Sequence, residues 1–159
     1  MRKIDQLFAE YGESHQNPTN KTIHWICVPL IFFSIVGLIA SIPSQAVQSI
    51  FGLGNPYANW AAVILVLVLI YYVSLSIPLS IGMMLFGALC LFLANFLARL
   101  INMPLWATSL IIFFLACIGQ FYGHKVEGKK PSFFKDIQFL LIGPAWLMHF
   151  IYKRLGIPY

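Results

Sequence analysis

Charged residues are scarce in this sequence. They make up 9% of its 159 residues, whereas hydrophobic residues make up 60%. A soluble globular domain carries about 25% charged residues, so the composition excludes a water-soluble fold. No Asp, Glu, Lys or Arg occurs from Thr22 to Ala98, and a second such stretch runs from Leu100 to His124. Because one bilayer crossing takes about 20 residues, the first stretch has room for about three membrane helices and the second adds another.

Acidic residues, cysteines and familiar catalytic motifs are equally sparse. The five Asp and Glu residues all lie outside the uncharged stretches, which argues against the paired carboxylates of glycosidases and di-iron bundles. The three cysteines have no metal-ligand spacing and are interpreted as small buried hydrophobic residues. There is no GxSxG elbow, P-loop or GxGxxG motif, and the pair Ser14-His15 lacks a third member for a serine hydrolase. No long basic run is present, which argues against a nucleic-acid partner.

The hydrophobic runs predict an all-α membrane protein with a single integral membrane domain over residues 1–159. About four transmembrane helices are expected within residues 22–123, at Lys21–Ser41, Trp60–Ser76, Leu79–Leu100 and Leu105–Gly123. Residues 1–21 form a polar cytoplasmic arm, in which helical spacing of apolar residues predicts a short amphipathic helix over Ile4–Tyr11. A cytoplasmic loop is expected at 124–136. The apolar segment at 137–152 is marginal for a crossing, so it is interfacial, re-entrant or a fifth membrane helix.

The distribution of Lys and Arg predicts the topology, because these residues favour the cytoplasmic ends of membrane helices. Two groups flank the four predicted helices: Arg2, Lys3 and Lys21 before them, and Lys125, Lys129, Lys130 and Lys135 after them. Arg99 ends the third helix and falls on the other side. Four crossings with both termini in the cytoplasm account for this pattern. It suits a multi-pass protein of a bacterial inner membrane, and a protein of the endoplasmic reticulum would have the same pattern.

The four histidines are the candidate metal ligands. His15 precedes the first predicted membrane helix, His24 lies in its first turns, and His124 lies at the end of the fourth. The predicted topology brings all three to the cytoplasmic face, and His149 approaches the same face. Neutral imidazole is the commonest metal ligand in proteins, and several imidazoles suffice for an iron, zinc or copper site. Taken singly, each histidine is better explained as an interfacial, hydrogen-bonded side chain, and only the four together indicate a metal site.

Several other polar residues lie beside these histidines in the sequence. Glu127 follows His124 by three residues and is expected on the same helix face, as a metal ligand or as an acceptor that orients a ligand. Tyr11 and Asn20 lie near the first two histidines, and Gln120 lies one turn before His124. Thr19 or Asn20 is expected to cap the first membrane helix, and Gly123 is expected to let the chain leave the fourth helix sharply.

Two spaced motifs carry a family resemblance. They are His15-x4-Asn20-x3-His24-x4-Pro29 and, about 90 residues later, Gln120-x2-Gly123-His124-x2-Glu127-x3-Pro131. Together with the uncharged middle of the chain, they resemble the Mpo-type family of membrane 2-hydroxy-fatty-acid dioxygenases, formerly a domain of unknown function. The resemblance implies an Fe(II)-dependent enzyme of fatty acid α-oxidation that uses O2 to shorten a 2-hydroxy fatty acid by one carbon.

The resemblance also implies roles for individual residues. His15, His24 and His124 inherit the iron-ligand role by their position in the motifs. The same three histidines and Glu127 are the candidate catalytic residues. His149 is a candidate fourth ligand, in a region where many relatives have an acidic residue. A 2-hydroxy carboxylate can chelate a ferrous ion, and Lys21 and Lys125 are expected to hold the carboxylate, with Asn20, Gln120 and Tyr11 beside the substrate. The acyl tail needs an apolar slot, for which the candidate aromatic residues are Trp25, Phe32, Phe33, Phe121 and Tyr122.

Two other readings of the sequence stay open at this point. The same histidines suit a different membrane metalloenzyme, such as a lipid hydroxylase or hydrolase. A non-enzymatic scaffold or transport subunit is the third reading, and the small number of polar residues within the predicted crossings argues against it. Bound metal distinguishes the third reading from the first two, and the identity of that metal together with O2 consumption distinguishes the first two from each other.

Overall fold

The protein is described by a computed structural model that covers residues 2–128 and 133–159. Within these ranges the chain is entirely helical, as predicted, and has no strand. The elements are α1 (Lys3–Gly12), α2 (Pro18–Ala40), α3 (Gln45–Phe51), α4 (Trp60–Leu75), α5 (Ile77–Leu100), α6 (Leu105–Glu127) and α7 (Phe133–Leu155).

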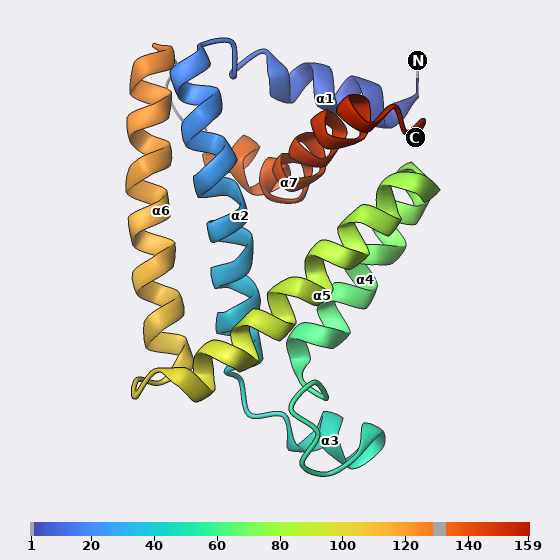
Figure 1. The fold of residues 1–159 in the computed structure, drawn as a ribbon, viewed down its shortest axis with the longest axis vertical. Helices are drawn as coiled ribbons and strands as arrows, with labels where there is room; N and C mark the ends of the chain where they lie inside the picture. The colour runs from blue at the N-terminus through green and yellow to red at the C-terminus, as the bar shows by residue number, and fades with distance from the viewer. Residues whose placement is uncertain (1, 129–132) are drawn as a thin grey trace.

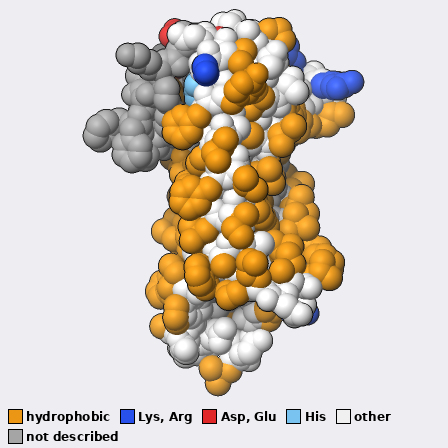
Figure 2. All heavy atoms as spheres, turned by 90° about the vertical axis from the view of Figure 1, so that its left-hand side faces the viewer, with side chains coloured by type: hydrophobic (Ala, Val, Ile, Leu, Met, Phe, Trp, Pro, Cys, Tyr) orange, Lys and Arg blue, Asp and Glu red, His pale blue; other side chains and the backbone are white. Residues whose placement is uncertain are grey.

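Three of the described helices are long and apolar enough to cross a membrane: α2, α5 and α6. At 1.5 Å per residue, helices of 23 or 24 residues reach about 35 Å, which exceeds the roughly 30 Å hydrocarbon core of a bilayer. Helix α4 is equally apolar but has 16 residues, so that it reaches only about 24 Å. Figure 2 shows a belt of hydrophobic side chains over the middle of the molecule, with basic side chains near its ends. This belt is the surface expected to face lipid.

The long helices alternate in direction. Helix α2 leads away from the end of the molecule that holds α1. Helices α4 and α5 form an antiparallel pair, and α6 returns alongside α2 (Figure 1). The start of α2 and the end of α6 therefore lie together at one end of the molecule, with Lys21 and Lys125 in those terminal turns. Arg99 is in the last turn of α5, at the other end. This arrangement matches the predicted grouping of the charges.

Helices α2 and α6 approach closely because small residues line their contact. A Cβ atom at Gly119 would lie 2.6 Å from Cys27 Sγ, and one at Gly123 would lie 2.5 Å from Asn20 Oδ1. The two glycines are four residues apart and so lie on one face of α6. Small residues at this spacing let helix backbones approach each other in membranes, where the hydrophobic effect does not drive helices together.

Helix α1 is amphipathic, as predicted, and packs its apolar face on α7. Ile4, Phe8 and Tyr11 are buried in one core cluster with Ile142 and Trp146. The predicted helix at Ile4–Tyr11 extends by one residue at each end. Figure 1 shows α1 and α7 close together, with the two chain ends near each other.

Three predicted boundaries at the polar end are wrong. Helix α6 does not end at Gly123 but continues to Glu127, and Gly128 closes it with a φ of 73°. The predicted loop at 124–136 is therefore helical at its start, and α7 already begins at Phe133 and continues to Leu155. The cap of α2 is Asn17, not Thr19 or Asn20, because its side chain accepts hydrogen bonds from the N–H groups of both.

Part of the predicted loop lies outside the described residues. This applies to Lys129, Lys130 and Pro131, and to the side chain of Lys135. Helix α7 ends with Lys153 and Arg154 and is not among the described helices that are apolar enough to cross a membrane. Its interfacial or re-entrant placement stays a prediction.

Candidate functional site

Three of the four histidines meet at the polar end of the molecule. The ring centroids of His15 and His24 are 4.3 Å apart, those of His24 and His124 are 5.2 Å apart, and those of His15 and His124 are 5.9 Å apart. His15 comes from the turn between α1 and α2, His24 from the second turn of α2, and His124 from the last turn of α6. Residues separated by about 100 positions in the chain thus form one cluster, which we call the histidine cluster.

Backbone carbonyl groups fix the orientation of two of these rings. Nδ1 of His15 lies 2.6 Å from the carbonyl oxygen of Tyr11, and Nδ1 of His24 lies 3.0 Å from that of Asn20. A carbonyl oxygen only accepts hydrogen bonds, so both Nδ1 atoms carry the proton and donate it. Nε2 of each neutral ring is then the basic nitrogen. This tautomer, held by a backbone carbonyl, is typical of histidines that bind a metal through Nε2.

The histidine cluster fits a metal ion in its donor type and its location. A ligand nitrogen lies about 2 Å from a transition metal, which places the ring centroids of ligands on one ion roughly 4.5–5.5 Å apart. The observed separations of 4.3–5.9 Å bracket this range. Among the described residues, however, no three His, Cys, Asp or Glu donors are already arranged as a finished metal site.

Aromatic side chains cover one side of the histidine cluster. The ring of Tyr11 stacks on His15 at a centroid distance of 4.2 Å and an angle of 11°. Trp146 of α7 lies 5.5 Å from His15 and 5.2 Å from Tyr11. These rings exclude water from the buried face of His15. Tyr11 was expected beside the substrate, whereas Trp146 was not expected at the site, because nothing in the sequence indicates that α7 folds back against α1.

Asn20 and Glu127 connect α2 to α6 beside the histidine cluster. Asn20 is completely buried, and its Nδ2 donates to the carbonyl of Ser14 at 3.2 Å and to Glu127 at 2.9 Å. Glu127 also accepts the backbone N–H groups of Gln16 and Asn17, at 2.8 Å and 2.9 Å. Both residues were candidates from the sequence, but their pairing was not foreseen.

His149 lies in a different environment. Its ring contacts Phe8 and Tyr159 at centroid distances of 5.2 Å and 5.3 Å, and its Nδ1 is hydrogen-bonded to the Tyr159 hydroxyl. Burial, reinforced by the nearby Lys153, lowers the pKa of His149, and Asp5 opposes this shift. No ring contact between His149 and another histidine occurs in the described part of the chain. The structure thus does not bring this candidate fourth ligand to the other three.

The remaining predicted substrate residues lie near the polar end of the molecule. Lys21 and Gln120 are half-buried, and Lys125 is exposed. Three aromatic residues expected to line an acyl slot, Trp25, Phe121 and Tyr122, are 41–61% exposed on the outer surface. They lie at the exposed surface and do not line a buried slot.

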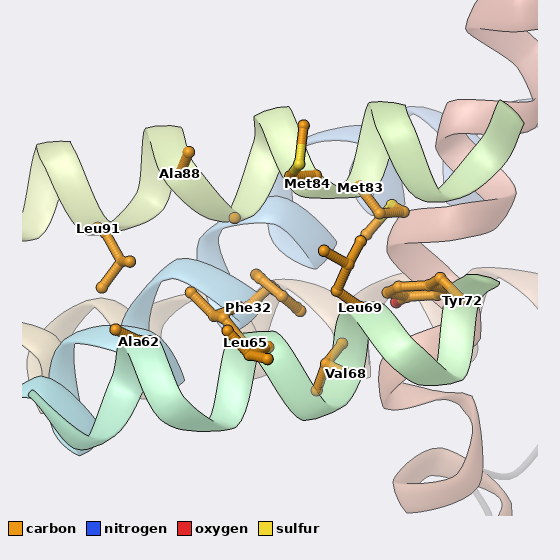
Figure 3. Close-up of a pocket in the computed structure, with 12 residues that line it drawn as sticks. Phe32, Ala62, Leu65, Val68, Leu69, Tyr72, Met83, Met84, Ala88 and Leu91 are labelled. Atoms are coloured by element: carbon orange, nitrogen blue, oxygen red, sulfur yellow. The ribbon is translucent and has the colours of Figure 1, made fainter. Parts of the chain in front are cut away.

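An apolar cavity of about 210 Å³ lies between α4 and α5, with Phe32 of α2 at its wall (Figure 3). Tyr72 is the one polar side chain among its lining residues, and its hydroxyl donates to the carbonyl of Leu141 at 2.6 Å. Phe32 follows His24 by eight residues, which is about 12 Å along a helix. The cavity is formed by contacts between helices, and sequence reasoning did not find it.

Comparison with protein-family models identifies a family. The model of the family described as 2-hydroxy-palmitic acid dioxygenase Mpo1-like matches residues 1–155. Searches of curated proteins and of solved structures gave no significant match. The family match covers both histidine motifs and the uncharged middle of the chain.

The contact between Gly123 and Asn20 provides a test of the site's packing. Asn20 Oδ1 is buried, has no hydrogen-bond partner among the described residues, and faces Gly123. We expect Gly123→Ala to lower the free energy of unfolding by about 1–3 kcal/mol, because the new Cβ displaces an amide that is held by two hydrogen bonds. Thermal unfolding in detergent, followed by circular dichroism, measures the loss. In an Asn20→Ala background the same change should lower the free energy of unfolding much less. Equal losses of unfolding free energy in both backgrounds would contradict the contact.

Proposed function

This chain belongs to the 2-hydroxy-palmitic acid dioxygenase Mpo1-like family, and we propose that it is an Fe(II)-dependent membrane dioxygenase that shortens 2-hydroxy fatty acids by one carbon. The observation that carries the proposal is the meeting of three imidazoles at one end of the helices, two of them with Nε2 as the basic nitrogen. Neutral imidazole is a suitable ligand for iron. The family name supports the substrate class.

His15, His24 and His124 are the residues that would hold the iron. When bound, the iron would supply the redox chemistry that lets O2 react with the 2-hydroxy acid. The backbone carbonyls of Tyr11 and Asn20 keep Nδ1 of the first two rings protonated, so that Nε2 is the basic nitrogen of each ring. Tyr11 and Trp146 exclude water from the buried side of His15.

The proposed reaction balances with O2 as the only co-reactant. A 2-hydroxy acid and equimolar O2 give the acid that is one carbon shorter, carbon dioxide and water. The bond between C1 and C2 breaks, and C1 leaves as carbon dioxide. The four electrons lost by the two carbon atoms reduce O2. No external reductant is needed, so the chain needs no flavin or nicotinamide site.

The substrate's head group is proposed to bind at the polar end of the molecule and its tail among the membrane helices. Lys21 and Lys125 flank the segments that carry His24 and His124 and supply positive charge for a carboxylate. Gln120 and Asn20 are the neighbouring amides. A fatty acid in a bilayer already has its carboxylate at the interface, so it reaches this end of the protein without leaving the membrane. The cytoplasmic face of a bacterial inner membrane is the proposed location.

The ligand assignment is tested by metal content. We expect His24→Ala and His124→Ala to lose bound iron while the protein still inserts in the membrane, because each change removes one of three imidazoles. Inductively coupled plasma mass spectrometry of anaerobically purified protein measures the iron. His149→Gln is the matched control and should keep its iron, since that ring packs on Phe8 and Tyr159. Full iron content in His24→Ala and His124→Ala would refute the assignment. Loss of iron in His149→Gln would show that His149 is a ligand.

The reaction is tested by its product. Protein loaded with Fe(II) should convert 2-hydroxypalmitate to pentadecanoate with equimolar O2 consumption, followed by mass spectrometry and an oxygen electrode. Palmitate, which lacks the 2-hydroxyl group, is the control and should not be shortened. Stoichiometric zinc with no O2 consumption would instead favour a hydrolase. Turnover without added or bound iron would contradict the proposed cofactor.

A further inference from the structure

The Glu127 carboxylate is already occupied by hydrogen-bond donors. Its Oε1 accepts the backbone N–H of Gln16 at 2.8 Å, and its Oε2 accepts the backbone N–H of Asn17 and Nδ2 of Asn20, both at 2.9 Å. A carboxylate offers about four acceptor sites, so most of its capacity is taken by nitrogen donors. This leaves little capacity for a metal.

The partners of Glu127 belong to the segments that carry the histidines. Gln16 directly follows His15, and the backbone carbonyl of Asn20 is the group that holds Nδ1 of His24. Glu127 itself lies three residues after His124, and so about one helical turn away on the same face. One carboxylate therefore links the three segments that carry the histidines, through two backbone N–H groups and the side chain of Asn20.

The start of α2 explains why a carboxylate occupies this position. Asn17 is the N-cap of α2, and in a capping box its backbone N–H would be accepted by a glutamate three residues later. That position is Asn20 here, and the carboxylate comes from α6 instead. A negative charge at a helix N-terminus is also stabilised by the helix dipole. A neutral side chain at 127 would lose the interaction of the charge with the dipole and would weaken these hydrogen bonds.

We infer that Glu127 is a positioning residue and not a metal ligand: it holds the end of α6, and with it His124, in register with His15 and His24. The inference rests on the proposed metal site for its functional meaning. The hydrogen bonds that support it involve protein groups alone. The two experiments below measure metal affinity and the protection of backbone amides from hydrogen exchange. Either result can contradict the inference independently of the other.

The first experiment measures metal binding. Glu127→Gln keeps the size of the side chain but turns an N–H donor toward other donors, and Glu127→Asp keeps the charge. We expect Co(II) affinity, from a titration of the visible spectrum, to fall about 10- to 100-fold in Glu127→Gln, with partial recovery in Glu127→Asp. At saturating Co(II) the spectrum should match that of the wild type. Glu10→Gln, an exposed change on α1, is the control and should bind like the wild type.

The second experiment needs no metal. Amide hydrogen exchange in the metal-free protein should be faster at Gln16 or Asn17 in Glu127→Gln, because an amide offers one acceptor oxygen in place of the two that accept these N–H groups. Exchange at both residues should be unchanged in Glu10→Gln. A changed Co(II) spectrum at saturation would make Glu127 a ligand and overturn the inference. Unchanged exchange at Gln16 and Asn17 would overturn it as well. If the wild type binds no metal, the proposed function fails, while the exchange measurement still decides whether Glu127 positions the segments.

Discussion

The close approach of α2 and α6 is the constraint on which the site depends. His24 and His124 lie on different helices, and their rings meet at 5.2 Å only because glycines of α6 face Cys27 and Asn20 across the contact. Inside a bilayer, lipid tails are as apolar as the side chains, so packing and hydrogen bonds must hold helices together. Here both act along the same contact. The glycines set the distance, and the hydrogen bonds of Glu127 and Asn20 set the register.

The polar groups of the site gather where the helices end, and the backbone explains why. A helix leaves its first N–H groups and its last carbonyl groups without intrahelical partners. Glu127 accepts such N–H groups at the start of α2, and His15 donates to a carbonyl in the last turns of α1. Polar side chains deeper in the bilayer would lack these partners and would be costly to bury. The ends of the helices are therefore the place where this chain can hold a cluster of imidazoles.

Local features of the site region were predictable from the sequence, and contacts between helices were not. Uncharged hydrophobic runs predicted the long helices to within a few residues, and the apolar spacing over Ile4–Tyr11 predicted α1. The distribution of Lys and Arg predicted that the start of α2 and the end of α6 lie at the same end of the molecule. Gly123 was misread as a helix end because its function is to make room for Asn20, which depends on a residue about 100 positions away. The spacing of Gly119 and Gly123 was the one sequence signal for that contact. Trp146 and the cavity beside Tyr72 had no local signal.

The contact between the two chain ends sets an order of events during synthesis. Arg2 pairs with Asp5, and it also donates to the main-chain oxygen of Tyr159, 157 residues away. Tyr11 and His15 likewise acquire Trp146 as a neighbour only when α7 has been made. As the chain emerges from the ribosome with its N-terminus first, the surroundings of its earliest histidine stay incomplete until α7 has been made. A ribosome stalled after α5 would leave a helical, inserted protein without α6, and hence without both His124 and Glu127.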